Sequence, residues 1–458
     1  MAVTGGATER WSSRTGFLFA AIGFSVGLGN IWRFPYVTGE YGGSAFLFIY
    51  LICAVCIGLP LLITELSIGR KGRAGPAGSI RAVAAESGAS SAWRHIGTLA
   101  SLCVFIVLSY YTVLSGWTFD YFIRAAGGDF DGIDATQSGN MFDVLMASPG
   151  RLLFWHTVVN VLIVLVVRRG VQSGIEKAVG IMMPILFIAL IVMVIYGAVA
   201  GDMASAIRFL LEPDFSKVTF QTVMVAIGQA FFSIGIGMAA LITFGSYLPR
   251  EVSIPRSGVT IIVADTGVAL LAGFVIFPLV FAFGLEPSSG SGLIFKALPL
   301  AFGQMPGGHF FGAVFFVLLI AAAMSSCIAC AEAVVSWVSD QFRIDRQVAV
   351  IYAVAAAWLV GVLSVMSLGE WSDIYPLDFV PAFAEKTIFD ALDFLAANIL
   401  LLLGGLLLSI FFGWLVPKQL KLDEIGVAEG AFFTFWRFMI RFVIPVVLLV
   451  ALVLGITE

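Results

Sequence analysis

The chain has 458 residues, of which 60% are apolar and only 12% are charged, and its formal net charge is −4. A soluble protein carries about twice this share of charged residues, so the composition excludes an ordinary soluble domain. No basic stripe supports binding to nucleic acid. Long apolar runs separated by short polar stretches predict an all-α polytopic protein embedded in the lipid bilayer.

The apolar runs predict eleven membrane-spanning helices, several of them longer than the roughly 20 residues that a span needs. They lie near 15–37, 43–69, 93–124, 152–168, 176–199, 220–248, 258–284, 309–340, 347–367, 387–416 and 432–455. Lys and Arg gather in alternate loops, for example Arg70, Lys71 and Arg73 after the second run. By the positive-inside rule the N-terminus is cytoplasmic and the C-terminus lies outside. The short termini favour the inner (plasma) membrane of a prokaryote.

Two of the eleven runs are interrupted by glycine and polar residues. The first contains "GFSVGLGNIWRFP" and the sixth contains "FFSIGIGMAALITFG". They open two five-span blocks, 15–199 and 220–416, between an N-terminal segment, 1–14, and a last span, 432–455. Paired interruptions at matching positions predict an inverted repeat with a binding site at the two breaks. Close helix packing through glycine is the alternative.

An unwound stretch of helix exposes amides and carbonyls, which in lipid occur only where they line a cavity or meet a ligand. Freed amides attract an anion such as a carboxylate, and freed carbonyls coordinate a cation such as Na⁺. The two breaks therefore predict a site that holds a zwitterion together with its coupling ion.

Ionisable and hydroxyl groups within the spans are the next candidates, because such groups are costly in lipid. Asp265 has no basic residue within a helical turn or two, which favours a bound cation over a protonated structural carboxyl. Glu65 is expected to accept a hydrogen bond from unwound backbone of another span. The hydroxyl of Tyr111 needs a buried partner, for which a substrate carboxylate would serve. Ser325 and Ser326 either bond to their own helix or bind a ligand.

Two pairs of charged residues are expected to close the ends of the pathway. Arg33 and Asp393 lie near the outer ends of the first and tenth spans, where an ion pair across a vestibule is expected. Asp340, at the inner end of the eighth span, is expected to pair with Arg10.

The cysteine pairs Cys53/Cys56 and Cys327/Cys330 have the C-x-x-C spacing of metal and redox sites. Small packing residues are the favoured interpretation, since both pairs lie in apolar runs. A membrane enzyme or redox protein built on them stays an alternative, as do an ion channel and a sensor that binds its ligand without moving it.

Several stretches carry a family resemblance: "GFSVGLGNIWRFPY", "EYGGSAF", "SYYTVLSGW", "GQAFFSIGIG" and "MSSCIACAE". Together they resemble the neurotransmitter:sodium symporter family, in its bacterial eleven-span branch, with similarity from Trp11 to the tenth span. The resemblance implies the LeuT fold, a 5+5 inverted repeat with broken helices 1 and 6 plus an eleventh helix. It also implies that the protein is not an enzyme, and that it is a monomer or weak dimer.

The resemblance further implies two sodium sites. The first would use the Ser25 carbonyl, Asn30, Ser233, Asp265 and the substrate carboxylate. The second would use the carbonyls of Gly23, Val26 and Ala322 and the hydroxyls of Ser325 and Ser326.

For the substrate, the resemblance implies a carboxylate held by the amides from Gly27 to Gly29 and by the Tyr111 hydroxyl. The substrate-binding residues would be Ser25, Gly27, Leu28, Gly29, Val107, Tyr111, Phe232, Ser233, Gly235, Met238, Ser326 and Cys330. The outer gate would comprise Arg33, Asp393 and Phe232, and the inner gate Trp11, Ser246, Tyr247 and Asp340.

Three details refine the expected activity. Monoamine carriers of the family have an aspartate where this chain has Gly27, so the substrate is expected to bring its own carboxylate, as a neutral, hydrophobic L-amino acid does. Asp265 and Ala269 replace residues of the animal chloride site, which predicts chloride-independent symport. Gly174 and Pro184 have the G-x9-P spacing that some bacterial members associate with unwinding of the fifth span.

Overall fold

The computed structural model describes residues 9–285 and 292–457, and within these ranges every regular element is a helix. The predicted segment 1–14 is therefore described only from residue 9 on. The helices of the first half are α1 (Arg14–Ser25), α2 (Phe34–Glu40), α3 (Ser44–Cys53), α4 (Leu59–Gly72), α5 (Pro76–Glu86), α6 (Arg94–Gly127), α7 (Ala135–Met146), α8 (Pro149–Val167), α9 (Lys177–Ala200) and α10 (Met203–Leu211).

The second half continues the same all-helical pattern. Its helices are α11 (Phe220–Ile234), α12 (Ala240–Ser246), α13 (Ile254–Ala282), α14 (Leu298–Gln304), α15 (Gly308–Phe342), α16 (Arg346–Ser367), α17 (Ile388–Phe394), α18 (Leu401–Ile410), α19 (Lys418–Ile425), α20 (Ala431–Phe438) and α21 (Ile444–Thr457). Wider π-helical turns occur at η1 (Gly29–Arg33), η2 (Ala54–Gly58), η4 (Val171–Glu176), η6 (Leu293–Ala297), η8 (Leu395–Leu400), η9 (Phe411–Leu415) and η10 (Met439–Val443). Short 3₁₀ turns lie at η3 (Ser91–Trp93), η5 (Phe215–Lys217) and η7 (Pro381–Phe383).

The predicted spans correspond to helices in the described part of the chain. Nine continuous helices are long and apolar enough to cross a membrane, and a tenth span is the bent pair formed by Arg14–Ser25 and Gly29–Glu40. The predicted sixth span is divided into α11 and α12, each too short to cross alone. The first and sixth spans are thus the discontinuous ones, as the glycine pattern predicts.

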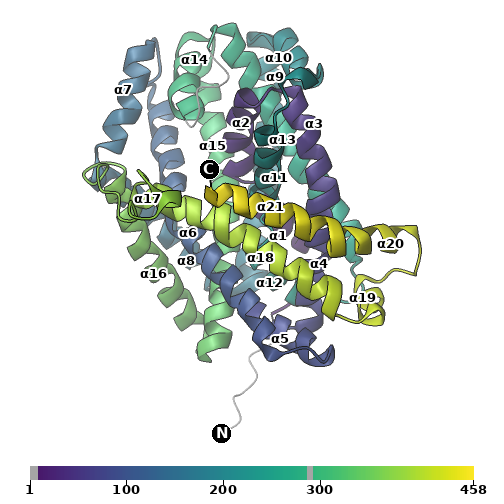
Figure 1. Cartoon of the computed structure of the whole chain (residues 1–458). Helices are drawn as coiled ribbons and strands as arrows, with labels where there is room; N and C mark the ends of the chain where they lie inside the picture. Colours follow the sequence, from purple (N-terminus) through teal and green to yellow (C-terminus); the bar gives the residue numbers. More distant parts are fainter. Residues whose placement is uncertain (1–8, 286–291, 458) are drawn as a thin grey trace.

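Several shorter helices are not predicted by a search for apolar runs. They lie in the connections between spans: α5, α7, α10, α14 and α19 (Figure 1). Local capping rather than hydropathy marks some of them, because Asp134 and Gln137 form a reciprocal capping box at the start of α7. Asp202 likewise accepts a hydrogen bond from the Ser205 amide at the start of α10.

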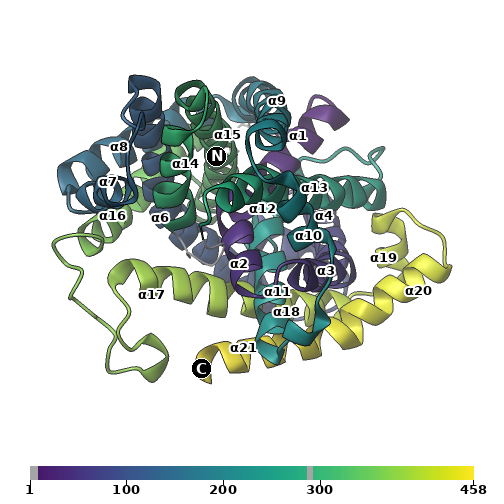
Figure 2. The same ribbon diagram turned by 90° about the horizontal axis from the view of Figure 1, so that it is seen from above.

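The long helices α6 and α15 lie side by side and are the most deeply buried of the continuous spans in the described chain (Figure 1). Small residues in α15, "AAAMSSCIACAEA", let the neighbouring helices approach closely. Seen from above, α2, α11 and α12 lie inside the bundle and α19–α21 lie along its rim (Figure 2). The two interrupted spans are therefore enclosed by other helices, where unpaired backbone can be accommodated.

Candidate functional site

The interruption in the first span leaves backbone groups that are satisfied by side chains of other helices. Helix α1 ends at Ser25, and Val26 has an extended conformation with ψ 97°. The Leu28 amide donates to the Tyr111 hydroxyl at 2.8 Å, and the Gly27 amide donates to Asn30 Oδ1 at 3.1 Å. Both amides point to oxygen acceptors, so this break attracts groups with negative or partial negative charge.

A buried carboxylate lies beside this break. Asp265 accepts hydrogen bonds from Asn30 Nδ2 at 2.8 Å, from Tyr50 at 3.0 Å and from Ser233 at 3.0 Å. These four residues, the Asp265 cluster, come from four separate helices and are buried. No Lys, Arg or His contacts the carboxylate within the described residues, as the sequence predicts. A cation would be a natural partner for this charge.

The interruption in the sixth span has its own acidic partner. Gly235 and Gly237 have φ of +75° and +81°, and Ala239 has φ of +60°, which end α11 and turn the chain toward α12. The Gly237 amide donates to Glu65 Oε1 at 2.6 Å. This confirms the prediction that Glu65 accepts a hydrogen bond from unwound backbone of another span.

A second group of oxygens lies where α15 meets the end of α1. Ser326 donates to the carbonyls of Gly23 and Phe24 at 3.2 and 3.0 Å, and Ser325 donates to the Ala322 carbonyl at 3.0 Å. A Cβ on Gly23 would lie 3.1 Å from Ser325 Cβ, so the two helices are in contact here. Ser325 therefore bonds to its own helix, one of the two alternatives from the sequence, whereas Ser326 bonds to another helix, and the ligand role of both stays a prediction.

The two interruptions enclose a narrow cavity of about 30 Å³. It is lined by Phe24 and by every residue predicted to contact the substrate except Leu28, whose amide instead holds Tyr111. A Cβ on Gly235 would lie 2.3 Å from the Phe24 ring, so the ring occupies the space that this glycine leaves. Small-molecule sites measure about 300 Å³ or more, so Phe24 or Phe232 has to move when a ligand enters.

The outer end of the cavity is closed by a cation–π contact. The Arg33 guanidinium lies 4.8 Å from the centre of the Phe232 ring. The expected Arg33–Asp393 ion pair is not among the ion pairs of the described residues, so that pairing is wrong for this structure. Arg33 instead covers the aromatic ring that covers the cavity.

The inner end is closed by Trp11, which is 3% exposed. Its Nε1 donates to the Phe244 carbonyl at 3.0 Å, and its amide donates to the Tyr247 carbonyl at 3.3 Å. These bonds join the chain before α1 to the end of α12. Both discontinuous spans are therefore tied together on this side.

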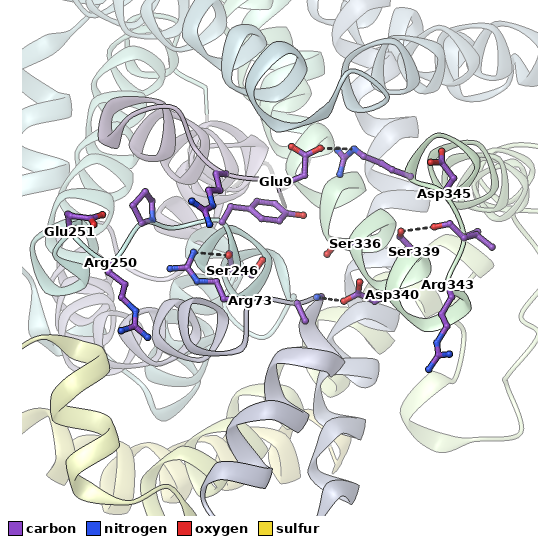
Figure 3. A pocket seen from close by; sticks show the side chains of 17 residues that line it. Glu9, Arg73, Ser246, Arg250, Glu251, Ser336, Ser339, Asp340, Arg343 and Asp345 are labelled. Atoms are coloured by element: carbon purple, nitrogen blue, oxygen red, sulfur yellow. Dashed lines mark hydrogen bonds and ion pairs between the residues drawn. The ribbon is translucent and has the colours of Figure 1, made fainter. Parts of the chain in front are cut away.

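Beyond Trp11 lies a wide cavity of about 1260 Å³ lined by charged residues (Figure 3). Asp340 lies here and accepts a hydrogen bond from the Gly75 amide. No Arg10–Asp340 ion pair is found in the described chain, so the expected partner is wrong. Arg73 Nη1 donates to the Ser246 carbonyl at 3.2 Å on the other side (Figure 3).

Sequence reasoning did not place Glu332, which is fully buried at the end of this cavity. Its carboxylate accepts from Tyr247 at 2.7 Å and forms an ion pair with Arg346 at 2.5 Å. Arg346 also reaches Glu9 at 3.5 Å and the Val167 carbonyl at 3.0 Å. An acidic residue within a predicted span indicates that a buried partner exists. The sequence alone does not show that this partner is Arg346.

Glu176 is the second acidic residue that the sequence left without a role. It lies at the end of η4, two residues after Gly174, and its carboxylate accepts from the Ser12 amide at 3.1 Å and from the Ser13 hydroxyl at 3.2 Å. Gly16 makes this possible, because a Cβ there would lie 1.7 Å from Glu176 Oε1. The start of α1 is therefore attached to the widened turn of the fifth span.

Replacing Glu176 by alanine is expected to loosen the start of α1, because the Ser12 and Ser13 donors lose a charged acceptor. Such bonds contribute about 1.5–3 kcal/mol, so hydrogen exchange of residues 9–16 should quicken by about tenfold or more. Lys177→Ala, at the next and exposed position, is the control. Equal exchange in both variants would contradict the attachment.

Two discontinuous membrane helices that meet at a narrow cavity are typical of a secondary transporter. The chain matches the Sodium:neurotransmitter symporter family over residues 8–131 and 143–458, and it belongs to this family. It is 35% identical to an uncharacterized sodium-dependent transporter of Bacillus subtilis, YhdH, over 444 residues that cover 96% of each chain. The sodium-dependent dopamine transporter of Bos taurus is 26% identical, over 98% of this chain and 69% of that one.

Among solved structures, the chain resembles MhsT in complex with L-phenylalanine. The TM-score is 0.90 at 36% sequence identity, and the match covers 98% of this chain and 99% of that one. The protein therefore has the LeuT fold of MhsT, and the resemblance found in the sequence is confirmed. It is a sodium-dependent symporter and a multi-pass membrane protein, in a family of transporters rather than enzymes.

Proposed function

We propose that the protein carries neutral, hydrophobic L-amino acids into the cell together with Na⁺, by alternating access and without chloride. The observation that supports this best is the close packing at Gly27, where a Cβ would lie 2.6 Å from both the Tyr111 hydroxyl and Ser326 Oγ. A side chain at this position would displace the Tyr111 hydroxyl, which is proposed to bind the substrate carboxylate. The substrate of the structurally similar MhsT complex, L-phenylalanine, is of this class.

The proposed binding residues are those that line the cavity. The substrate carboxylate would accept from the backbone around Gly27–Gly29 and from Tyr111, since Tyr111 already lies 2.8 Å from the Leu28 amide. Val107, Gly235, Met238 and Cys330 would surround the side chain. Methionine adapts to different shapes, which favours a range of hydrophobic substrates.

Two sodium sites are part of the proposal. The first uses Asn30, Ser233 and Asp265 of the Asp265 cluster with the Ser25 carbonyl, and for this the Asn30 amide has to rotate, because its nitrogen rather than its oxygen faces Asp265 here. The second uses the oxygens of Gly23, Val26, Ala322, Ser325 and Ser326. Sodium at the first site would meet the substrate carboxylate directly, so each ligand would strengthen binding of the other.

The transport cycle would move the two ends of the cavity in turn. The outer closure is Arg33 over Phe232, and the inner closure is Trp11 with Tyr247 and Asp340. We place the N-terminus in the cytoplasm and the C-terminus outside, in the plasma membrane. Residues 15–199 and 220–416 are the proposed inverted repeats with 432–455 as an additional span, and the proposed functional unit is a monomer or weak dimer.

Thermal unfolding with matched ligands tests the substrate class. L-phenylalanine should raise the midpoint in Na⁺ but not in K⁺, and phenethylamine, which lacks the carboxylate, should not raise it. A ligand at about a hundred times its Kd stabilises by about 2.7 kcal/mol, which is readily measured. The shift should persist when gluconate replaces chloride. Equal stabilisation by the amine would refute the carboxylate role, and loss of the shift in gluconate would refute chloride independence.

A further inference from the structure

Three basic side chains gather where the tenth and eleventh spans approach each other, away from the proposed transport site. Lys421 of α19 is 2% exposed, and its Nζ donates to the Gly413 carbonyl at 2.8 Å. Arg437 and Arg441 lie one turn apart at the start of the eleventh span. The Arg441 guanidinium lies 4.5 Å from the centre of the Trp414 ring. We call Lys421, Arg437 and Arg441 the basic cluster.

No protein carboxylate balances the basic cluster within the described part of the chain. The nearby acidic residues contact other groups: Glu424 pairs with Arg70 and Lys71, Glu429 pairs with Lys418, and Asp423 accepts a hydrogen bond from Gln419. The Nε atoms of Arg437 and Arg441 are buried and have no hydrogen-bond partner among the described residues. Buried donors without acceptors are costly, so these two arginines indicate a missing anion.

The positive charges around Lys421 also indicate a missing anion. Burial, and then the positive charges of Arg441 and Arg437, lower the pKa of Lys421 to about 7. Lys421 therefore lies close enough to the two guanidinium groups to be repelled by them. An anion between them would offset this repulsion and favour the charged form of Lys421.

The position of the basic cluster identifies the source of the anion. Exposed aromatic side chains surround it on the outer face of the bundle, as expected of a surface in contact with lipid. They are Trp414, Phe432, Phe435, Phe438 and Phe442. Arg70, at the end of α4, bonds to Glu424 of α19, so α19 with Lys421 lies on the side of the molecule that carries the N-terminal chain (Figure 1).

We propose that the basic cluster binds the phosphate of an anionic phospholipid in the leaflet on the N-terminal side. This leaflet is the cytoplasmic one if the proposed orientation holds. The guanidinium groups of Arg437 and Arg441 suit two oxygens of one phosphate, because each offers a planar fork of donors. The exposed phenylalanines would contact the acyl chains, and Trp414 holds Arg441 in place.

Lipid retention by the purified full-length protein tests this proposal. Native mass spectrometry would follow titration with phosphatidylglycerol or phosphatidylcholine, without Na⁺ or amino acid, so that the result is independent of transport. Phosphatidylglycerol should bind preferentially, and R437Q/R441Q should weaken its binding by about thirtyfold, since each basic residue near the surface contributes about 1 kcal/mol. R441Q alone should weaken phosphatidylglycerol binding by about fivefold, and this single variant provides the test if the double variant does not fold.

Arg94→Gln with Arg256→Gln is the matched control, because it removes the same charge from two exposed arginines. It should leave retention within about twofold. Equal weakening in this control, or no preference for phosphatidylglycerol, would overturn the proposal. Inorganic phosphate at millimolar concentration should not displace the lipid; if it does, the site takes a free anion and the lipid assignment is wrong.

Discussion

Replacing Asp265 by asparagine is expected to lower the apparent affinity for sodium by about a hundredfold or more. The substitution keeps the shape of the side chain but removes the carboxylate that accepts hydrogen bonds from Asn30, Tyr50 and Ser233. A cation 4 Å from a carboxylate gains about 4 kcal/mol at an effective dielectric constant of about 20, and nearby dipoles recover only part of it. Sodium titration of uptake or of thermal stability measures the change.

The same variant tests whether the Asp265 carboxylate supplies the negative charge that chloride would otherwise provide. If the carboxylate supplies the negative charge, D265N should be inactive in gluconate and should regain part of its uptake in chloride, or else remain inactive in both. Asp129→Asn, at an exposed position, is the control and should behave like the original protein. Unchanged sodium affinity in D265N with gluconate would refute the charge-balancing role.

Replacing Gly27 by alanine is expected to reduce substrate binding by about a hundredfold or more while sodium binding at the second site persists. The new Cβ would lie 2.6 Å from two oxygens, those of Tyr111 and Ser326. Tyr111 would have to leave the Leu28 amide, and a buried donor without its acceptor costs about 1–3 kcal/mol in addition to the steric conflict. Equilibrium binding of a radiolabelled amino acid in saturating Na⁺ measures the loss.

Gly228→Ala is the matched control for Gly27, because it adds the same methyl group to a glycine of a spanning helix with no atom within 4 Å. It should bind substrate as the original protein does, and both variants should have similar unfolding midpoints in Na⁺ without substrate. Substrate binding by G27A within a few-fold of the control would show that the carboxylate does not occupy this place.

Much of the fold could be predicted because membrane spans follow from hydropathy alone. Each of the eleven apolar runs corresponds to a helix or a helix pair, and the glycine-rich interruptions lie where α1 ends and where α11 ends. The short helices of the connections escaped the prediction because they are shorter than a membrane span, including α14 in the apolar segment Leu293–Gln304. The capping residues Asp134 and Gln137 predict the start of α7, but α14 and α19 have no side-chain cap that would predict them.

For the site, the lining of the cavity could be predicted but the pairings of charged residues could not. The family resemblance named eleven of the twelve residues that line the cavity, because its motifs on the interrupted runs and on α6 and α15 come together there. The pairings between distant charged residues could not be predicted from the sequence. Arg33 contacts Phe232 instead of Asp393, and Asp340 binds a backbone amide instead of Arg10. A long arginine side chain reaches several partners, and only the packed structure selects one of them. Phe24 was not predicted to line the cavity. Its ring fills space left by Gly235 of another span, and only the packed structure brings the two residues together.

The central claim, sodium-driven transport of a hydrophobic amino acid, is tested most directly by uptake into proteoliposomes. Radiolabelled L-phenylalanine would be supplied with an inward Na⁺ gradient, with equal K⁺ in place of Na⁺, and with an ionophore that dissipates the gradient. We predict transient accumulation above the external concentration with Na⁺ alone, and none in the other two conditions. Equilibration at the same rate with and without Na⁺, or no uptake of any hydrophobic amino acid, would contradict it.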